Sequence, residues 1–533
     1  HSRYRDTPNP GAGGVIDRAA VTRFWIDARP YFVFVLLLVV LSGCAGPALR
    51  DDLPRPEPSY ALPPASSGVL SGIADRVTDR YGSGASGFQL LDGSHDALTW
   101  RLALIDSAAS SLDILTYLWY GDVSGNLILE RVVLAAQRGI RVRLVIDDLM
   151  TIGQDQALAN IQALPNVELR LFNPWEKRNL GSRAGEMIAQ MERLNSRMHD
   201  KLIIADGHAA ILGGRNIGDH YFGLSHHYNF HDLDVLAIGE LARDANMMFD
   251  HFWNSEWLAT AAQLTTLPDS SKAEAGWQRL QQGNREAKEL ASFSRSPRDW
   301  SAKLEASLDT LRPGTGYLVF DEVTATAVDQ GMLATMFEFF RQAENELLIT
   351  NAYIIPGEPG IEMLQQLTDR GVDIRILTNS LASHDVPAVN SHYEPWRKAI
   401  ISAGAELYEL RADAAIQDIV DVPPASGKFV GLHTKAAVVD GQHVFIGSMN
   451  LDPRSAAINT EMGAILDSPA LAEDLRRVML RDMQADNAWH VALSGDDKLS
   501  WSNDQETVSS QPTRGFLQNV MNVVFKIVPR EQF

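Results

Sequence analysis

The sequence predicts an α/β protein of two similar halves, each a mixed β-sheet flanked by helices, with the functional site where the halves meet. Two observations support this prediction. Apolar strands and amphipathic helices alternate along the chain, which is typical of sheets covered by helices. The same strand–helix–strand order then occurs twice, and each copy is followed by a strand with the same histidine motif. With 533 residues, 45% of them hydrophobic, the chain is long enough to bury a large core.

The first 85 residues are predicted to precede the folded body. Residues 1–44 contain a short apolar run after Arg23 and Arg29, and they end in the lipobox-like sequence Leu41-Ser42-Gly43-Cys44. This order is typical of a secretory signal, and the run is shorter than the ~20 residues of a membrane-spanning helix. We therefore expect lipidation at Cys44 and a lipoprotein of the bacterial cell envelope that faces the periplasm; an uncleaved anchor is the alternative. Residues 45–85 are rich in Pro, Ser and Gly, which predicts a tether.

The first half is predicted at residues 86–300 and the second at residues 301–490. The expected elements are strands at 111–117, 140–146, 346–353 and 372–377, and helices at 125–138 and 360–369. Gly139 and Gly371 follow these helices and are expected to end them. Residues 491–533 are predicted to form a tail. The apolar spacing of residues 515–528 suits an amphipathic helix that docks on the body or lies on a membrane surface.

Each half carries one copy of the motif H-x-K-x4-D, followed by a short turn that contains glycine. The motif residues are His199, Lys201 and Asp206 in the first copy, and His433, Lys435 and Asp440 in the second. The turns carry Asn216 in the first half, and Ser448 and Asn450 in the second. Because side chains alternate faces along a strand, each histidine points the same way as its lysine. One such motif is weak evidence, but two at equivalent places of a repeated fold are specific.

This pairing of residue types suits the chemistry of a phosphodiester. One histidine can attack phosphorus and form a phosphohistidine, which splits one difficult displacement into two easier ones. The other histidine can protonate the leaving alcohol and then activate the incoming one. The two lysines supply positive charge to the phosphate oxygens. Asn216, Ser448 and Asn450 are predicted to add hydrogen bonds to these oxygens.

The doubled motif, with nearly all of residues 86–493 around it, resembles the phospholipase D superfamily. The resemblance implies a phosphohistidine mechanism without a metal ion or other cofactor. It also implies that an acidic residue downstream of each motif orients the histidine, and the candidates are Asp232 and Glu461. Asp206 and Asp440 complete the catalytic motifs. For these two aspartates we expect a structural role, in which each ties the end of its strand to a neighbouring loop, more than a chemical one.

Within the superfamily, the sequence is most similar to bacterial cardiolipin synthases of the C type. The stretches that carry this similarity are 197–199, 214–219, 378–387, 393–397 and 407–410. The resemblance implies transfer of a phosphatidyl group to phosphatidylglycerol, with phosphatidylethanolamine as a candidate second lipid. Hydrolysis to phosphatidic acid, a nuclease and a non-catalytic scaffold are the alternatives. The net charge of −20 disfavours nucleic acid as a partner, and a scaffold has no need of either His–Lys pair.

Overall fold

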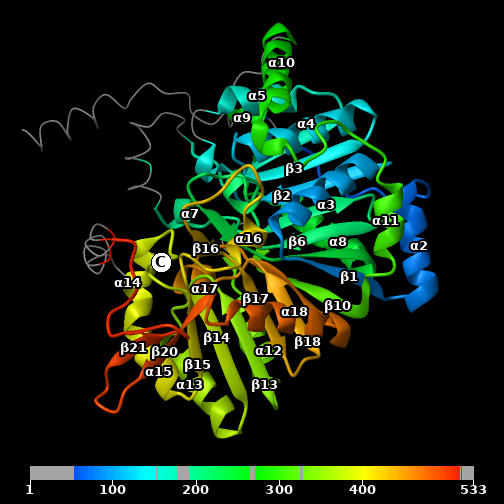
Figure 1. Cartoon of the computed structure of the whole chain (residues 1–533). Helices are drawn as coiled ribbons and strands as arrows, with labels where there is room; N and C mark the ends of the chain where they lie inside the picture. Colours follow the sequence, from blue (N-terminus) through cyan, green and yellow to red (C-terminus); the bar gives the residue numbers. More distant parts are fainter. Residues whose placement is uncertain are drawn as a thin grey trace, which may run out of the picture.

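The computed structural model describes residues 53, 55–151, 154–176, 186, 191–264, 270–324, 328–515, 518 and 522. Cys44, the signal segment and most of the predicted C-terminal helix lie outside these residues. Figure 1 shows the first half in blue to green and the second half in green through yellow to red, with the two halves packed against each other. Within the described ranges, no helix is both long enough and apolar enough to cross a membrane.

Within the described residues, one continuous sheet of 18 strands runs through both halves. From one edge to the other, the first half contributes β9 (Leu258–Thr260), β4 (Val167–Phe172), β3 (Arg141–Asp147), β2 (Ser111–Thr116), β5 (Lys201–Ala205), β6 (Ala209–Gly213), β8 (Asp234–Gly239) and β1 (Ser86–Leu91). The second half continues with β10 (Arg312–Phe320), β19 (Met462–Asp467), β18 (His443–Gly447), β17 (Lys435–Val439), β13 (Glu346–Asn351), β14 (Asp373–Asn379), β15 (Glu406–Leu410), β20 (Ala488–Leu493), β21 (Leu499–Ser502) and β22 (Thr507–Val508).

The two halves of this sheet repeat the same topology. In the first half, β2 pairs in parallel with β3 and antiparallel with β5, which carries the first motif. In the second half, β13 pairs in parallel with β14 and antiparallel with β17, which carries the second motif. The two repeats meet where β1 pairs with β10. The prediction of two similar halves with mixed, helix-flanked sheets is therefore confirmed, although the sheets of the two halves join into one. The motif strands occupy equivalent central positions.

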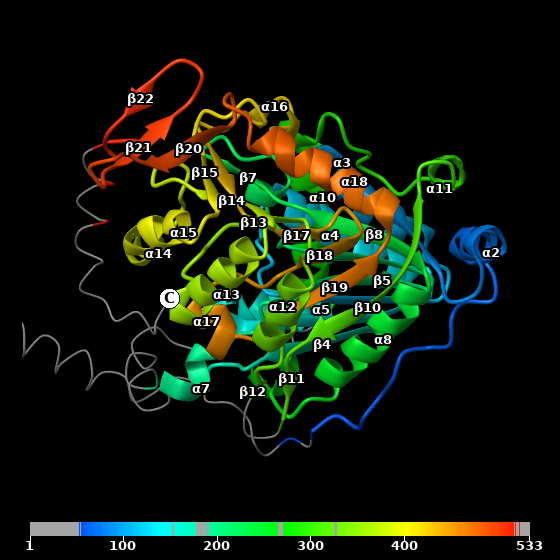
Figure 2. The same ribbon diagram turned by 90° about the horizontal axis from the view of Figure 1, so that it is seen from below.

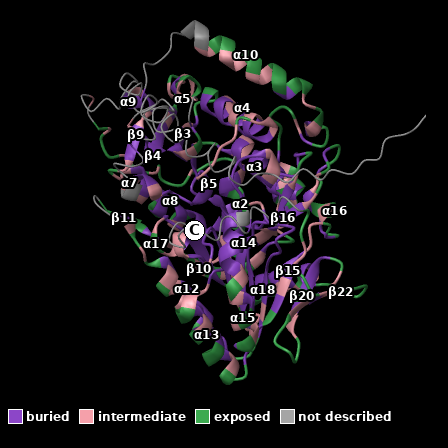
Figure 3. Cartoon of the chain, turned by 90° about the vertical axis from the view of Figure 1, so that its left-hand side faces the viewer, coloured by how far each residue is buried: buried purple, intermediate pink, exposed green. Residues whose placement is uncertain are grey.

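Helices flank the sheet in both repeats. Those of the first half are α2 (Val69–Tyr81), α3 (Ser94–Ser107), α4 (Val123–Gln137), α5 (Asp155–Gln162), α7 (Met191–Asn195), α8 (Glu240–Trp253), α9 (Ala261–Leu264), α10 (Ser270–Glu286) and α11 (Ser301–Ser307). Those of the second half are α12 (Met332–Arg341), α13 (Gly357–Asp369), α14 (Pro387–Tyr393), α15 (Arg397–Ser402), α16 (Gln417–Val420), α17 (Pro453–Ala457) and α18 (Pro469–Asp482). Figure 3 shows the strands largely buried, while α10 exposes much of its surface.

A shared apolar core holds the two halves together, and we call it the inner core. It joins buried residues of β6 and β8 to buried residues of β18 and β19, with α8 and α18 packed against them. The first half has a separate outer core beneath α2, α3 and α4, and the second half has one beneath α12, α13 and α15. Because the inner core draws on both halves, their faces are fixed relative to each other at the motif strands.

Two predicted boundaries are wrong. The predicted tether, residues 45–85, contains α2, in which Leu70, Ile73 and Val77 are fully buried on the first outer core. These positions follow the spacing of an amphipathic helix, and the Pro-rich composition before them concealed it. The predicted boundary at residue 490 falls inside β20, and the sheet extends through β21 and β22 into the expected tail.

Asp206 and Asp440 close equivalent turns at the ends of the two motif strands. Asp206 has a left-handed backbone, with φ 57°, and its carboxylate accepts hydrogen bonds from the backbone N–H groups of residues 109–111 at 2.7–3.1 Å. Asp440, with φ 53°, accepts from the backbone N–H groups of residues 344–346 at 2.7–2.9 Å. Each aspartate therefore ties the end of a motif strand to the loop that leads into β2 or β13.

We expect Asp206→Ala to destabilise the protein by about 2–4 kcal/mol, because several backbone N–H groups would lose a charged acceptor in a buried site. Asp440→Ala should cost less, since two of its three bonds are exposed to solvent. Urea unfolding followed by fluorescence measures both changes, and Asp206→Asn, which keeps one acceptor oxygen, is the control. A fully stable Asp206→Ala variant without turnover would contradict this structural role and assign the residue to chemistry.

Candidate active site

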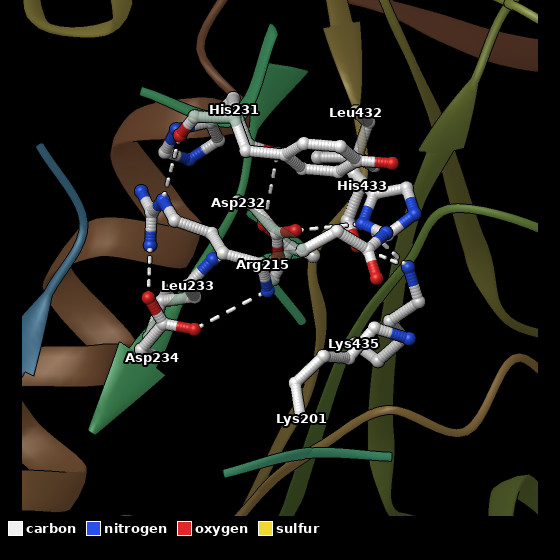
Figure 4. Close-up of polar contacts among 12 residues, drawn as sticks. Lys201, Arg215, His231, Asp232, Leu233, Asp234, Leu432, His433 and Lys435 are labelled. Carbon is white, nitrogen blue, oxygen red and sulfur yellow. Dashed lines mark hydrogen bonds and ion pairs between the residues drawn. The ribbon is translucent and has the colours of Figure 1, made fainter. Parts of the chain in front are cut away.

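The two His–Lys pairs lie together in one buried site. His199 and His433 lie two residues before the first residues of β5 and β17, which are Lys201 and Lys435. All four are at most 7% exposed. Each lysine ammonium donates a hydrogen bond to the carbonyl of its own motif histidine. Figure 4 shows Lys201, His433 and Lys435 side by side, so the motif of each half contributes to the same site.

Each orienting acid reaches the histidine of the other half. Nδ1 of His199 lies 2.9 Å from Oε2 of Glu461, and Nδ1 of His433 lies 2.6 Å from Oδ2 of Asp232. Asp232 and Glu461 are therefore the acids that contact the histidines, as the sequence predicts, but each contacts the histidine of the other half and not the one upstream of it. Because Nδ1 is engaged in both rings, Nε2 is the nitrogen left for chemistry.

Backbone pairing between the halves produces this exchange. β7 (Asn229–His231) pairs in parallel with β16 (Val430–Leu432), and the N–H of His433 donates to the carbonyl of His231 at 2.8 Å. At the equivalent place, Met198 pairs in parallel with Thr460, and the N–H of His199 donates to the Thr460 carbonyl at 3.0 Å. The residue before each histidine thus pairs with the residue before the acid of the other half.

The two acids are held differently. A Cβ on Gly214 would lie 2.1 Å from Oδ1 of Asp232, so only glycine allows this carboxylate its place. At the corresponding position of the second half, the Ser448 hydroxyl donates to Oε2 of Glu461 at 2.6 Å. Ser448 is therefore engaged with the acid, whereas the sequence predicts that it binds phosphate. The sequence shows that glycine stands in one turn where serine stands in the other, but it does not show that the serine contacts Glu461.

Asn216 and Asn450 occupy equivalent positions close to the motif strands. The side-chain oxygen of Asn216 accepts a hydrogen bond from the N–H of Leu118 at 3.3 Å. The side-chain oxygen of Asn450 is buried and has no hydrogen-bond partner among the described residues. A buried polar atom without a partner is costly, so Asn450 is suited to contact a ligand or a water molecule.

Burial shifts the lysines and histidines toward their neutral forms. It lowers the pKa of Lys201 to about 7 and the pKa of Lys435 to about 8, against the opposing charges of the nearby acids. Burial and the two lysine charges hold the pKa of His199 well below its usual range. Burial and Lys435 also lower the pKa of His433, although Asp232 opposes this change. Both imidazoles are therefore neutral at neutral pH, which is the form that attacks phosphorus or accepts a proton.

The two acids differ in charge state. Burial raises the pKa of Glu461 well above its usual range, and the charge of Lys201 offsets this only in part. Burial works to raise the pKa of Asp232, but the charge and hydrogen bond of His433 and the charge of Lys435 outweigh burial and hold the pKa below its usual value. The His433–Asp232 pair therefore contains an ionised carboxylate, whereas the His199–Glu461 pair favours two neutral groups. The two histidines are thus chemically distinct.

Residues that the motif analysis did not select complete the site. The ring of Tyr117 lies edge-on to the His199 ring, with 5.0 Å between the ring centroids. The ring centroids of Tyr221 and Phe230 lie 5.2 and 5.1 Å from that of His433. The fully buried Arg215 donates to Asp234, two residues after Asp232, at 3.0 Å (Figure 4). These groups fix the imidazole rings and the strand that carries Asp232. Their positions depend on tertiary packing, so no motif spacing pointed to them.

Comparisons with known proteins identify the relatives of this chain. The family model described as "Cardiolipin synthase, PLD-like domain" matches residues 102–253 and 336–483. Cardiolipin synthase C of Escherichia coli (strain K12) is 33% identical over 84% of this chain and 96% of its own length. An uncharacterized protein of Helicobacter pylori (strain J99) is 30% identical over 94% of this chain and 99% of its own length.

Among solved structures, phosphatidylserine synthase of Haemophilus influenzae Rd KW20 shares the fold. Its TM-score is 0.52 at 14% sequence identity, over 77% of this chain and 91% of that chain. The family match covers both repeats, and each matched range contains one complete H-x-K-x4-D motif. The chain therefore belongs to the cardiolipin synthase family of phospholipase D-like proteins.

Proposed function

We propose that the protein is a phosphatidyl transferase that makes cardiolipin from phosphatidylglycerol and a second phospholipid. The observation that carries the proposal is the crossed pair of His–acid contacts, with two lysines, in one buried site. That site suits two successive displacements at one phosphorus atom. The name of the Escherichia coli relative supports cardiolipin as the product.

His199 serves as the nucleophile in this proposal and His433 as the acid and base. Nε2 of His199 attacks phosphorus of the donor lipid and a P–N bond forms. The P–O bond to the leaving alcohol breaks as the protonated form of His433, the imidazolium that Asp232 stabilises, transfers its Nε2 proton to that oxygen and becomes neutral. His433 then removes the proton from a glycerol hydroxyl of phosphatidylglycerol. The oxygen attacks phosphorus, the P–N bond breaks, and His199 is restored.

The difference between the two acids supports this assignment. The ionised carboxylate of Asp232 stabilises the imidazolium that forms when His433 accepts a proton. His199 faces Glu461, which favours its neutral form, and the charges of both lysines act against protonation of its ring. His199 therefore stays unprotonated and free to attack. The ammonium groups of Lys201 and Lys435 are available to the phosphate oxygens. The side-chain oxygen of Asn450, which is buried without a partner among the described residues, can accept a hydrogen bond from a hydroxyl of the substrate.

Hydrolysis shares the phosphohistidine and differs only in the acceptor, so a phospholipase D activity remains the second candidate. The site excludes bulk water in part, because both histidines are at least nine-tenths buried. A nuclease activity is disfavoured by the net charge of −20, since binding to nucleic acid gains from surplus positive charge.

The products of the full chain with phosphatidylglycerol vesicles, with and without phosphatidylethanolamine, test the function directly. We expect cardiolipin, separated by thin-layer chromatography. A requirement for phosphatidylethanolamine would identify it as the donor. Phosphatidic acid as the sole product would replace the transferase with a phospholipase D, and no lipid product would overturn both.

Two variants in the same assay test the roles of the histidines. His433→Ala should lower turnover by about 10²–10⁴-fold and leave the phosphatidyl group on His199, since the second displacement lacks its base. Mass spectrometry of the quenched protein detects this adduct. His199→Ala should show neither product nor adduct. An adduct on His433 in the His199→Ala variant would reverse the assignment.

The lysines predict the pH dependence of kcat/KM. An ammonium group loses its positive charge above its pKa, so kcat/KM should fall as the pH rises through about 7 and about 8, the pKa values of Lys201 and Lys435. Lys201→Arg and Lys435→Arg keep the charge at these pH values. Both should flatten the alkaline decline, even where their maximal rates are lower. If both variants lose kcat/KM with rising pH as steeply as the unsubstituted protein does, another group controls the decline.

We further propose that lipidated Cys44 holds the protein at the membrane of the bacterial cell envelope, on the periplasmic side. The support is the signal-like sequence that ends in Leu41-Ser42-Gly43-Cys44. Cys44 is the one cysteine of the chain, so Cys44→Ser should abolish incorporation of radiolabelled palmitate in a bacterial host. Ser42→Ala, which keeps a small residue at that position, is the matched control. Label retained in Cys44→Ser would exclude this anchor.

A further inference from the structure

An apolar cavity of about 220 Å³ lies in the second half, between the sheet and its outer helices. Strands β13 and β14 form its floor, and α12, α13 and α17 form its walls. Figure 2 shows these three helices beside one another on the second half. Its lining includes Phe337, Ile349, Ile354, Met363, Leu451 and Ala456. Asp452 is the only charged residue among the described residues that line it.

One wall of the cavity is formed by the chain segment that directly follows Asn450. Leu451 and Asp452 follow Asn450, whose side-chain oxygen is buried without a partner. The N–H of Ile355 donates to the Leu451 carbonyl at 2.7 Å, which joins two lining segments at this end. The positive charge of Lys435 acts on the carboxylate of Asp452. The polar end of the cavity therefore lies within electrostatic reach of a lysine of the His–Lys pairs.

The equivalent position of the first half carries a larger side chain. There Trp119 pairs with Ile217 as Ile354 pairs with Leu451 in the second half. The indole N–H of Trp119 donates to the Gly125 carbonyl at 3.1 Å, and the ring packs against the first outer core. The two repeats thus differ in side-chain size at one matched position. Protein cores are normally close-packed, so an apolar space beside a site for chemistry suits an apolar ligand.

We propose that this cavity receives one acyl chain of the lipid whose phosphodiester is bound between the two His–Lys pairs. The inference rests on the proposed function, because it requires a phospholipid substrate. An acyl chain matches the lining, which is apolar except at Asp452. The chain would enter past residues 450–452, which places the glycerol of the lipid close to Lys435 and Asn450. The cavity then selects substrates by acyl-chain length, a property that the catalytic motifs do not determine.

A chain-length comparison tests the proposal with the full chain in mixed micelles. Phosphatidylglycerol with long acyl chains should be used with a kcat/KM at least about tenfold above that of a short-chain form. Ala456→Phe places a ring in the cavity and should remove this preference, while turnover of the short-chain lipid is retained. Ala457→Phe is the matched control: the neighbouring residue of α17 is exposed and does not line the cavity. It should behave as the unsubstituted protein.

Photolabelling provides a second measurement that depends neither on turnover nor on a variant. Phosphatidylglycerol with a diazirine at the end of one acyl chain should label peptides of α12 or α13 in the unsubstituted protein. Equal kcat/KM for long and short chains, a preference unchanged in Ala456→Phe, or labelling confined to other segments would each overturn the acyl-chain site. Labelling of α12 or α13 without any lipid product would retain the binding site and reject the proposed function.

Discussion

The exchange of acids between the halves depends on two short parallel backbone pairings, and the active site cannot form without them. β7 pairs with β16, and Met198 pairs with Thr460, so the backbone hydrogen bonds that join the halves directly precede the histidines and the acids. Backbone pairing fixes both the register and the direction of a strand, and a shift by one residue would turn the acid away from its imidazole. Neither half alone therefore holds an oriented histidine. The inner core, which packs the two sheets together, is as necessary to the chemistry as the motif residues.

Burial of such a site costs free energy. Two lysines, two histidines and two acids occupy a region that is almost closed to solvent, and removing charges from water costs several kcal/mol for each ion. The shifts of the pKa values toward neutral forms show how the structure limits this cost. They also leave groups that can change charge during the reaction, which a fully ionised set of salt bridges would not allow. The cost of burial and the capacity for proton transfer thus have the same physical origin.

Much of the fold could be predicted from local patterns. The alternation of apolar strands and helices predicted β2, α4, β3 and their counterparts β13, α13 and β14, and these predictions are confirmed. The crossing of Asp232 and Glu461 could not be predicted, because β7 and β16 have only three residues each and carry no periodic signal. The engagement of Ser448 with Glu461 was missed for the same reason: it depends on which strand lies next to the turn. Helix α2 was the opposite case, since its apolar spacing was present but the Pro-rich composition of the segment outweighed it.

The repeat supplies a symmetric frame, and the reaction needs that symmetry to be broken. A double displacement requires one histidine that attacks and another that moves protons, although both arise from the same motif. The backbone around the two histidines is equivalent, so their different chemistry must come from the neighbouring side chains. Asp232 contacts one histidine and Glu461 the other, and Gly214 in one turn corresponds to Ser448 in the other. The proposed lipid site follows the same principle, because Trp119 occupies in one half the position that the smaller Ile354, which lines the cavity, occupies in the other. Since a shared frame fixes the distances between reacting groups, substitutions around it can assign different tasks to the two halves without disturbing the site at their junction.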